Sequence, residues 1–384
     1  MGLTIKEVLT AADKKKFIGF PHDLYIHDPN YVPELNISVQ DILNPRKNAF
    51  FEHSEAALFL AVQDNKTVGR IAAIRNNNYN QYHQSNVGFF GFFDVTDQYE
   101  VAEILLNQAF TWCKNQGFDQ LLGPVNFTTN DTAGLLIDGY DSPPVVLMTY
   151  NKPYYLDFLT RFGFSKEIDL SAVLFDRRIN YDKPLKVAAL LKERLQSHGF
   201  VFRNINMKTI DQEIAQVISI YNAAWENNWG FVPPTPNETR HLVKNLVQIG
   251  DPRYVYMVED QGKLIGFALG LPNINEKLIK IKRGRLFPFG IFRLLSGFKK
   301  VKMVRIILLG VLPEYRKKGI ESVLYASFIL DGYRNNLDAI EASWILENNT
   351  LMNSALDKIG GFRYKTYRIF SMPISHTAGG VMNG

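Results

Sequence analysis

The sequence predicts a mixed α/β protein of the α+β class, built from two tandem domains that each hold a mixed sheet flanked by helices. A chain of 384 residues is too long for one ordinary core, and its length favours about two domains. Its apolar content of 46% and charged content of 21% are typical of a globular protein. Two pairs of similar segments indicate that one domain has been duplicated.

The first pair of similar segments is a predicted hairpin. Residues 58–73 (LFLAVQDNKTVGRIAA) and 254–270 (YVYMVEDQGKLIGFALG) each contain an apolar strand, a tight polar turn and a second strand with a glycine. The second pair, residues 154–164 and 352–362, reads as a short amphipathic helix that ends at glycine and phenylalanine. The predicted boundaries are 1–175 and 200–375 for the two domains, 176–199 for a helical connector and 376–384 for a flexible tail.

Helices alternate with strands in the second half, which favours a mixed sheet with helices on its faces. Apolar runs bounded by turn residues predict the strands, and amphipathic stretches predict the helices. The predicted strands are 201–207, the two strands of the 254–270 hairpin, 304–311, 339–345 and 363–371. The predicted helices are 211–226, 236–248, 319–334 and 349–359, and the connector is expected to be helical over 185–198.

Composition excludes several kinds of site. No run of about 18 apolar residues is present, which excludes a membrane-spanning helix, and the N-terminus MGLTIKEVLTAADKKKF lacks the apolar core of a secretion signal, so we expect a cytoplasmic protein. Cys113 is the single cysteine, which excludes an internal disulfide. Because it lies on an apolar helical stripe, we expect a buried structural thiol. The seven histidines show no metal-ligand spacing, and no metal is expected.

Positive charge is concentrated in one segment. Residues 277–305 hold ten Lys or Arg and no acid, which leaves 33 bases against 38 acids in the rest of the chain. Four phenylalanines alternate with these cations, namely Phe287, Phe289, Phe292 and Phe298. Such a segment most often folds onto its own domain as a solvated insertion. The alternatives are contact with nucleic acid, an anionic membrane or an acidic acceptor.

The stretch GVLPEYRKKGIESVLYASF, residues 310–328, predicts a binding site for an anion. A strand leads into a proline-marked turn and then into a helix whose first backbone N–H groups have no intrahelical partner. Gly319 lets a ligand approach the backbone closely, and the side chains of 316–318 add positive charge. Phosphate is the expected guest, although the patterns of nucleotide hydrolases and of dinucleotide-binding folds are both missing.

At these residues the sequence resembles the GNAT acyltransferase superfamily, whose members hold the acyl-CoA diphosphate on the pattern [QR]-x-x-G-x-[GA]. Residues 316–320 match this pattern, and NNTLMNSALDKIGGF, 348–362, resembles the downstream motif N-x-x-A-x-x-L-Y-x-K-x-G-F. The resemblance implies a mostly antiparallel twisted sheet in each of two GNAT-like domains, and acetyl-CoA or another acyl-CoA as cosubstrate. The residues it assigns to acyl-CoA are Leu309, Val311, Arg316, Lys317, Lys318, Gly319, Ile320, Glu321, Ser322 and Asn349.

Two positions depart from the family pattern. Glu321 occupies the last Gly or Ala of the cradle, where repulsion of a phosphate about 4 Å away reaches about 4 kcal/mol at an effective dielectric of 20. We therefore expect its carboxylate to point to solvent and to pair with a lysine such as Lys317; the alternative is weakened CoA binding. Leu356 stands where the family usually has the tyrosine that protonates the leaving thiolate, so that proton must come from elsewhere or from water.

The resemblance implies an N-acyltransferase, with acetyl transfer to a small-molecule or peptide amine as the expected reaction. Because such an amine is protonated at neutral pH, a carboxylate base would help. The candidates are Glu341, on the strand after the cradle and near Ser343, Glu347 just beyond that strand, and Glu226 at the end of the first helix. The backbone N–H of Val311 is expected to hold the thioester oxygen. A binding protein without catalytic activity is the alternative.

Candidate residues for the acceptor come from both halves. Trp225 and Trp229 fall where this family has its substrate-side helices, although core packing explains them equally well. In the first half, Asn126 and Asn130 belong to a polar cluster that either faces a cleft or caps the next helix. The first half has no cradle of its own, because three acids and no glycine follow its strand VGFFGFFDV. We therefore expect it to leave CoA unbound and to act as a cleft wall or in dimerisation.

Overall fold

The computed structural model describes residues 2–288, 290–295 and 300–375. The chain forms two compact units. Unit 1 consists of Met1–Ile168, Ile281–Gly290 and Tyr367–Gly384, and unit 2 consists of Asp169–Lys280 and Ile291–Thr366. The predicted tail 376–384, and Phe289 and Phe298 of the basic segment, lie outside the described residues.

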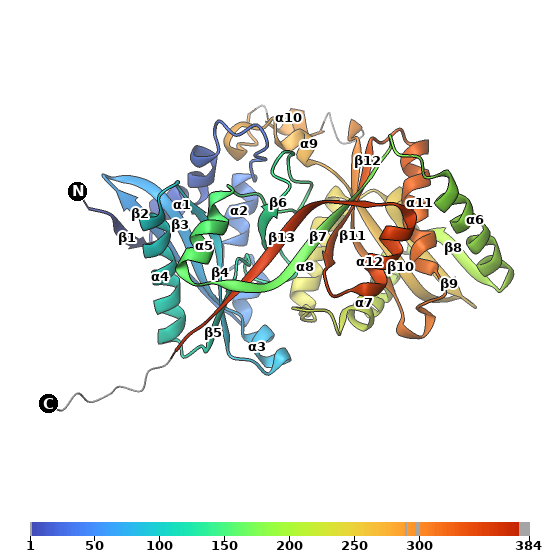
Figure 1. Ribbon diagram of the computed structural model, residues 1–384, viewed down its shortest axis with the longest axis horizontal. Coiled ribbons are helices and arrows are strands. Elements are labelled where there is room, and N and C mark those ends of the chain that lie inside the picture. The colour runs from blue at the N-terminus through green and yellow to red at the C-terminus, as the bar shows by residue number, and fades with distance from the viewer. Residues whose placement is uncertain (1, 289, 296–299, 376–384) are drawn as a thin grey trace. The chain divides into compact units, whose positions relative to one another are not determined.

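Unit 1 contains an antiparallel ladder that ends in one parallel pair of strands (Figure 1). Its strand order is β1-β2-β3-β4-β5, in which only β4 and β5 run parallel. The strands are β1 (Thr4–Glu7), β2 (Glu55–Gln63), β3 (Lys66–Arg75), β4 (Val87–Val95) and β5 (Gln120–Gly123), with the short β6 (Leu135–Asp138) outside this ladder. The antiparallel strands β2 and β3, joined by a two-residue turn, form the predicted hairpin.

The helices of unit 1 follow the strands in sequence. They are α1 (Ala11–Leu24), α2 (Asn36–Ile42), α3 (Asn77–His83), α4 (Tyr99–Asn115) and α5 (Tyr154–Phe162). The apolar stripe of α4 is buried in the core of unit 1 and includes Cys113. Burial raises the pKa of the Cys113 thiol to about 12, which confirms the expected structural thiol.

Unit 2 repeats this strand pattern. Its order is β8-β9-β10-β11-β12-β7, again antiparallel except for one parallel pair, β11 and β12. The strands are β7 (Ser165–Asp176), β8 (Phe200–Asn204), β9 (Val255–Asp260), β10 (Lys263–Pro272), β11 (Met303–Val311) and β12 (Ala339–Leu346). The mixed, mostly antiparallel sheet and the duplication predicted from the sequence are therefore confirmed.

Two strands, β7 and β13, pair with strands that come from the other half of the sequence. Residues 170–176 of β7 follow the first-half helix α5 but pair antiparallel with β12 in unit 2. The last residues of β13 (Phe362–Pro373) come from the second half but pair antiparallel with β5 in unit 1, where Phe370 lies opposite Gly123. Each sheet is thus completed by a strand from the other half, so the compact units are discontinuous in sequence.

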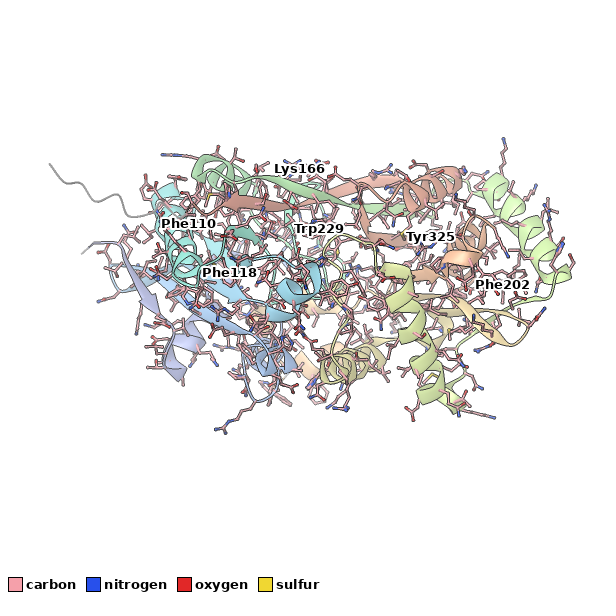
Figure 2. All side chains as sticks on the ribbon, turned by 90° about the horizontal axis from the view of Figure 1, so that it is seen from below. Phe110, Phe118, Lys166, Phe202, Trp229 and Tyr325 are labelled. Atoms are coloured by element: carbon pink, nitrogen blue, oxygen red, sulfur yellow. The ribbon has the colours of Figure 1, made fainter. Side chains whose placement is uncertain are left out.

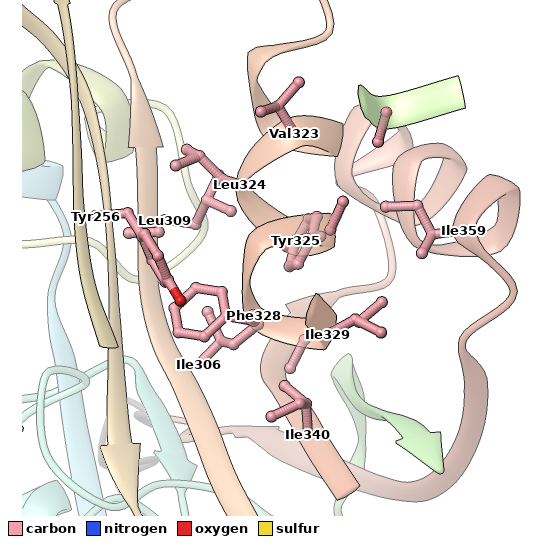
Figure 3. Close-up of a cluster of buried hydrophobic side chains, with 14 of the residues drawn as sticks. Tyr256, Ile306, Leu309, Val323, Leu324, Tyr325, Phe328, Ile329, Ile340 and Ile359 are labelled. Carbon is pink, nitrogen blue, oxygen red and sulfur yellow. The ribbon is translucent and has the colours of Figure 1, made fainter. Parts of the chain in front are cut away.

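Helices cover both faces of the unit 2 strands. They are α6 (Asp182–Ser197), α7 (Ile210–Trp225), α8 (Pro236–Ile249), α9 (Asn275–Leu278), α10 (Gly290–Leu295), α11 (Ile320–Arg334) and α12 (Thr350–Ile359). Figure 3 shows Tyr325 and Phe328 of α11 packed among Ile306, Ile340 and Ile359, in the larger core of this unit. A second, smaller core lies under α7, around Met257 and Phe267. None of the helices in the described ranges is long and apolar enough to cross a membrane.

Candidate functional site

The strands β11 and β12 separate at their carboxyl ends. Their parallel register runs from Met303 opposite Ala339 to Ile306 opposite Ala342. Beyond these residues β11 continues to Val311, but the described pairing of its remaining residues is with β10 alone. An opening between two parallel strands leaves backbone donors and acceptors of β11 without a strand partner on that side. We refer to this opening as the wedge.

The backbone N–H of Val311 points into the wedge. The next residue, Leu312, donates its N–H to the carbonyl oxygen of Ile265 on β10, at 2.9 Å. Backbone groups of successive residues in a strand point to opposite sides, so the N–H and carbonyl of Val311 are directed away from β10. This geometry agrees with the expected role of Val311 as a donor to a carbonyl oxygen in the wedge.

The turn after β11 has the backbone conformation of an anion cradle. A short helical turn, η6 (Pro313–Tyr315), is followed by two left-handed residues, Lys317 with φ 63° and Gly319 with φ 84°. Gly319 is the N-cap of α11, and no side chain caps this helix. The first-turn N–H groups therefore remain available at the positive end of the helix dipole.

The three cations of the cradle differ in their surroundings. The Arg316 guanidinium donates to the carbonyl oxygen of Ala224, at 2.9 Å, and to that of Val311, at 3.4 Å. It therefore ties the cradle to the last turn of α7. Lys317 is exposed, and the Lys318 ammonium lies 4.7 Å from the centre of the Tyr315 ring. The two lysines are accordingly the cations at the surface of the cradle.

Glu321 is buried, and the expectation that its carboxylate points to solvent is wrong. Only 8% of its surface is exposed, while Lys317, the expected partner, lies at the surface. Burial raises the pKa of the Glu321 carboxyl, whereas a hydrogen bond from its own backbone N–H and the charge of Arg316 lower it. The buried carboxyl lies in the first turn of α11, whose backbone N–H groups are the donors that a bound phosphate would use.

A buried hydroxyl lies one turn further along α11. Tyr325 is fully buried, and its hydroxyl has no hydrogen-bond partner among the described residues (Figure 2). Burial and the nearby charge of Glu321 raise its pKa. Leu356, at the position of the family's tyrosine, is fully buried in the same core. Sequence reasoning missed Tyr325, although its spacing of four residues from Glu321 places both on one helix face.

Glu341 lies at the centre of a buried polar cluster. Its carboxylate accepts hydrogen bonds from the hydroxyls of Ser343 and Tyr364 and lies 4.0 Å from Nε of Arg305. Arg305 in turn donates to the hydroxyl of Ser343, at 2.9 Å. Burial raises the pKa of Glu341, and Arg305, the two hydroxyl donors and the nearby Lys365 lower it. A carboxylate in this balance of effects is suited to accept a proton.

Strand alternation places this cluster on the α7 face of the sheet. Ile306 and Ile340 point towards α11 (Figure 3), so their neighbours Arg305 and Glu341 point to the opposite face. That face carries the smaller core with α7, in which Trp225 packs against Phe267 at a ring distance of 6.1 Å. The cradle and the Glu341 cluster are therefore reached from the two faces of the sheet on either side of the wedge.

Trp225 closes the end of β11 on the α7 face. A side chain at Gly310 would lie 2.5 Å from the Trp225 ring, so the indole rests directly on the strand backbone. Trp229 is half-buried in the turn that follows α7 (Figure 2). Trp225 is thus next to Val311 in the fold and is the better placed of the two predicted acceptor residues.

The remaining candidates of unit 2 have structural surroundings. Glu226 is exposed at the C-cap of α7. Glu347 is exposed beyond β12, and its carboxylate accepts the backbone N–H of Asp169 at 3.1 Å. Asn349 caps α12 by accepting the N–H of Met352 at 3.1 Å. Among the three predicted bases, Glu341 is therefore the one that the fold encloses with charged and hydroxyl partners.

In unit 1 the equivalent opening is filled by the chain itself. The strands β4 and β5 also separate, but the N–H of Val125 donates to the carbonyl of Phe90 at 2.8 Å. The side-chain oxygen of Asn126 accepts the N–H of Phe92, also at 2.8 Å. A side chain at Gly91 would lie 2.0 Å from the Val125 carbonyl oxygen. Asn126 thus takes a backbone donor in the place where a ligand would lie.

Asn130 belongs to a polar turn in the same segment. Its N–H donates to the hydroxyl of Thr128 at 3.2 Å, and that hydroxyl bonds Asp131 at 2.8 Å. Sequence reasoning also missed Arg305, Tyr364 and Lys365, which reach Glu341 from a neighbouring strand and from β13. Within the described ranges, no cluster of His, Cys, Asp and Glu is suited to hold a metal ion.

Two curated proteins resemble the chain over nearly its whole length. The bacterial ceramide synthase of Caulobacter vibrioides is 35% identical over 376 residues, which cover 96% of this chain and 97% of that protein. Protein YghO of Escherichia coli is 34% identical over 378 residues, which cover 96% of this chain and 95% of that protein. No family model matches the chain.

Solved structures share the fold at low sequence identity. A tandem GNAT protein from the clavulanic acid biosynthesis pathway matches with a TM-score of 0.58 at 12% identity, over 98% of this chain and all of that one. A GCN5-related N-acetyltransferase from Sphaerobacter thermophilus matches with a TM-score of 0.55 at 11% identity, over 97% and 96% of the two chains. The tandem GNAT fold is therefore established for both halves of the chain.

Proposed function

The chain belongs to the GNAT-fold acyltransferase family of bacterial ceramide synthase and protein YghO, and we propose that it transfers an acyl group from acyl-CoA to an amine. The observation that carries this proposal is the buried Glu341 cluster beside the wedge, opposite a helix start that has no N-cap side chain. A base on one side and an anion cradle on the other are the two parts that such a transfer needs.

In the proposed reaction, the cradle at the start of α11 holds the CoA diphosphate, and the thioester lies in the wedge. The Val311 N–H donates to the thioester oxygen, on which negative charge develops as the amine nitrogen attacks the carbonyl carbon. The bond to sulfur then breaks, giving an amide and free CoA. Glu341, directly or through a water molecule, takes the proton that the amine nitrogen loses.

The base has a defined thermodynamic task. An amine with a pKa near 10.4 costs about 4.6 kcal/mol to deprotonate at pH 7. The buried Glu341 has a pKa raised by burial, which makes it a stronger base than an exposed glutamate. Its two hydroxyl donors, Ser343 and Tyr364, also provide a path along which a proton can move.

The thiolate leaving group needs a proton donor. Leu356 supplies none, and the buried hydroxyl of Tyr325 lacks a partner among the described side chains and main-chain groups. We therefore include Tyr325 in the proposal as a candidate donor, with water as the alternative. A Tyr325→Phe variant that releases thiol at the wild-type rate would assign this step to water.

For the acceptor we propose a long-chain amino alcohol, a narrower class than the small-molecule or peptide amine expected from sequence. The name of the Caulobacter relative supports this choice, because a ceramide is the amide of a fatty acid and a long-chain amino alcohol. The helix α8 supports it as well: none of its residues is buried, and Val247 is 53% exposed. An exposed apolar side chain such as Val247 suits an alkyl chain better than a charged peptide.

The proposal is tested with the purified full-length chain and a panel of donors and acceptors. We expect thiol release from palmitoyl-CoA with sphinganine, little release from acetyl-CoA, and none with lysine peptides or spermidine. Mass spectrometry of the product must show the amide. Turnover of acetyl-CoA with polar amines alone would reject the long-chain acceptor and restore the acetyltransferase expected from sequence.

A second candidate function, a CoA-binding protein without catalysis, is favoured by Glu321. Its buried carboxyl lies in the first turn of α11, beside the proposed phosphate site. Calorimetry that shows acyl-CoA binding, together with no turnover for any amine in the panel, would select this candidate. Turnover that is lost in Glu341→Gln would exclude it.

A further inference from the structure

We propose that the side chain of Arg316 positions the acceptor side of the site rather than the acyl-CoA diphosphate. Its guanidinium is half-buried and donates to the carbonyl oxygen of Ala224, in the last turn of α7, at 2.9 Å. Its Nε also donates to the carbonyl oxygen of Val311, at 3.4 Å. All three residues belong to unit 2. The inference rests on the proposed function, in which the acceptor amine attacks a thioester next to the Val311 backbone.

The end of α7 takes its cation from another element. The last carbonyl groups of an α-helix have no intrahelical partner and carry the negative end of the helix dipole. The last turn of α7 contains no basic residue, and its C-cap residue is the acid Glu226. The N–H of Asn228 donates to the carbonyl oxygen of Trp225 at 2.8 Å, and Arg316 donates to that of Ala224. Arg316 thus caps the C-terminus of α7 from the turn after β11.

The capped end of α7 holds the indole of Trp225 against β11. A side chain at Gly310 would lie 2.5 Å from the Trp225 ring and 3.2 Å from Cβ of Ala224, so helix and strand are in direct contact. The Trp225 ring also lies 6.1 Å from the ring of Phe267 on β10. Gly310 immediately precedes Val311, whose N–H is the proposed donor to the thioester oxygen. A shift of this helix end would therefore move the acceptor-side wall relative to the reacting carbonyl.

Lys317 and Lys318 are better placed than Arg316 to meet a phosphate. Both lysines are exposed, whereas the hydrogen bonds of Arg316 direct its guanidinium towards two backbone carbonyl oxygens. A phosphate that recruited Arg316 would have to break these bonds and release the end of α7. We therefore expect a division of labour in which the two lysines determine acyl-CoA affinity and Arg316 determines acceptor binding.

The test compares two variants of the full-length chain, Arg316→Met and the double variant Lys317→Met with Lys318→Met. We expect Arg316→Met to raise the KM for sphinganine about tenfold or more and to leave the Kd for palmitoyl-CoA within about twofold. The lysine double variant should raise the Kd for palmitoyl-CoA about tenfold and leave the KM for sphinganine within about twofold. Arg316→Lys should recover part of the acceptor KM, because an ammonium keeps the charge at the helix end but lacks the planar fork of donors.

A second readout does not require turnover. Hydrogen–deuterium exchange of the peptide 217–231 should be faster in Arg316→Met than in the wild type, because the last turn of α7 loses its cap. It should be unchanged in the lysine double variant, and exchange of the α8 peptide 236–249 should be unchanged in both.

Two results would overturn the proposal: unchanged exchange of 217–231 in Arg316→Met, or a loss of palmitoyl-CoA affinity in Arg316→Met equal to that of the lysine double variant. If no amine in the panel is turned over, the proposed function fails by itself. The exchange and calorimetric results then still decide whether Arg316 holds α7 or the diphosphate.

Discussion

Arg305 and Glu341 are register partners on the two parallel strands that separate to form the wedge. Their side chains, 4% and 1% exposed, lie on one face of the sheet, with Nε of Arg305 4.0 Å from the Glu341 carboxylate. Ser343 joins them, because its hydroxyl donates to Glu341 and accepts from Arg305. This arrangement surrounds a buried carboxyl with a cation and a hydroxyl donor where strand pairing ends, next to the site where the proposed thioester binds.

Glu341→Gln should lower turnover at least about a hundredfold and leave acyl-CoA affinity within about twofold, because general-base catalysis contributes about 10²–10⁴-fold. The amide preserves the size of the side chain but cannot accept the proton. Glu347→Gln is the matched control, since Glu347 is exposed beyond the same strand. Steady-state rates and calorimetry separate the two effects, and an active Glu341→Gln enzyme would remove Glu341 from the mechanism.

Tyr364→Phe should move the acid limb of the pH profile of kcat to higher pH. The ionised form of Glu341 is the base, so the rate rises as pH increases through its pKa. The Tyr364 hydroxyl donates to the carboxylate and lowers that pKa. Burial raises the pKa of Glu341 and the Tyr364 hydrogen bond lowers it, so removal of this donor should raise the pKa.

The control for this pH experiment is Tyr333→Phe, whose hydroxyl bonds the carbonyl of Ile179. Its profile should match that of the wild type. An acid limb that stays in place, or moves to lower pH, in Tyr364→Phe would show that a group other than Glu341 controls the limb.

Glu321→Gln should tighten acyl-CoA binding about tenfold at low salt, since relief of about 1.4 kcal/mol of repulsion gives that factor. The buried carboxylate lies in the first turn of α11 and would face the bound diphosphate. Glu321→Gly should act in the same direction. The matched control is Glu314→Gln in η6, the short turn before α11; the Glu314 side chain is 57% exposed. Equal affinities for wild type and Glu321→Gln would show that the carboxyl is neutral or turned away in the complex.

Gly319→Ala should weaken acyl-CoA binding about tenfold. Alanine would be strained in the left-handed conformation of residue 319, and its Cβ would lie 2.5 Å from the Leu191 side chain. Gly262→Ala is the matched control. Gly262 also has a positive φ, 78°, but has open space around it, in the β9–β10 turn. Both variants should lose about 1–2 kcal/mol of unfolding free energy. A similar loss of affinity in both would attribute the effect to stability alone.

The chain should bind one acyl-CoA, and Gly319→Asp should abolish that binding. In unit 1 the equivalent opening is occupied by Val125 and Asn126, whose groups satisfy the backbone of Phe90 and Phe92. Calorimetry of the full-length chain gives the stoichiometry directly. If Gly319→Asp still bound one acyl-CoA per chain, the acyl-CoA site would lie outside the cradle.

The sequence by itself determined the duplication, the order of the strands in the second half with the helices α7, α8, α11 and α12, and the strand-turn-helix that forms the proposed cradle; the short helices α9 and α10 were not predicted. These features depend on local properties: apolar periodicity, a glycine with positive φ and a helix without a side-chain cap. Glu341 was a candidate base from sequence, because the strand that enters the cradle offers no carboxylate and Glu341 lies on the next strand. Interactions between neighbours in the chain are sufficient for such predictions.

Only the tertiary structure decided which of these residues act together. Arg305 lies 36 positions before Glu341 and Tyr364 lies 23 positions after it, and parallel pairing and β13 bring their side chains to one carboxylate. The inward turn of Glu321 was mispredicted because its environment depends on the packing of α11 in its core, which sequence spacing does not encode. The pairing of β7 with β12 and of β13 with β5 also depends on long-range packing, which sequence spacing does not encode. Two similar sheets offer similar edges, and long-range packing selects the edge on which each strand is added.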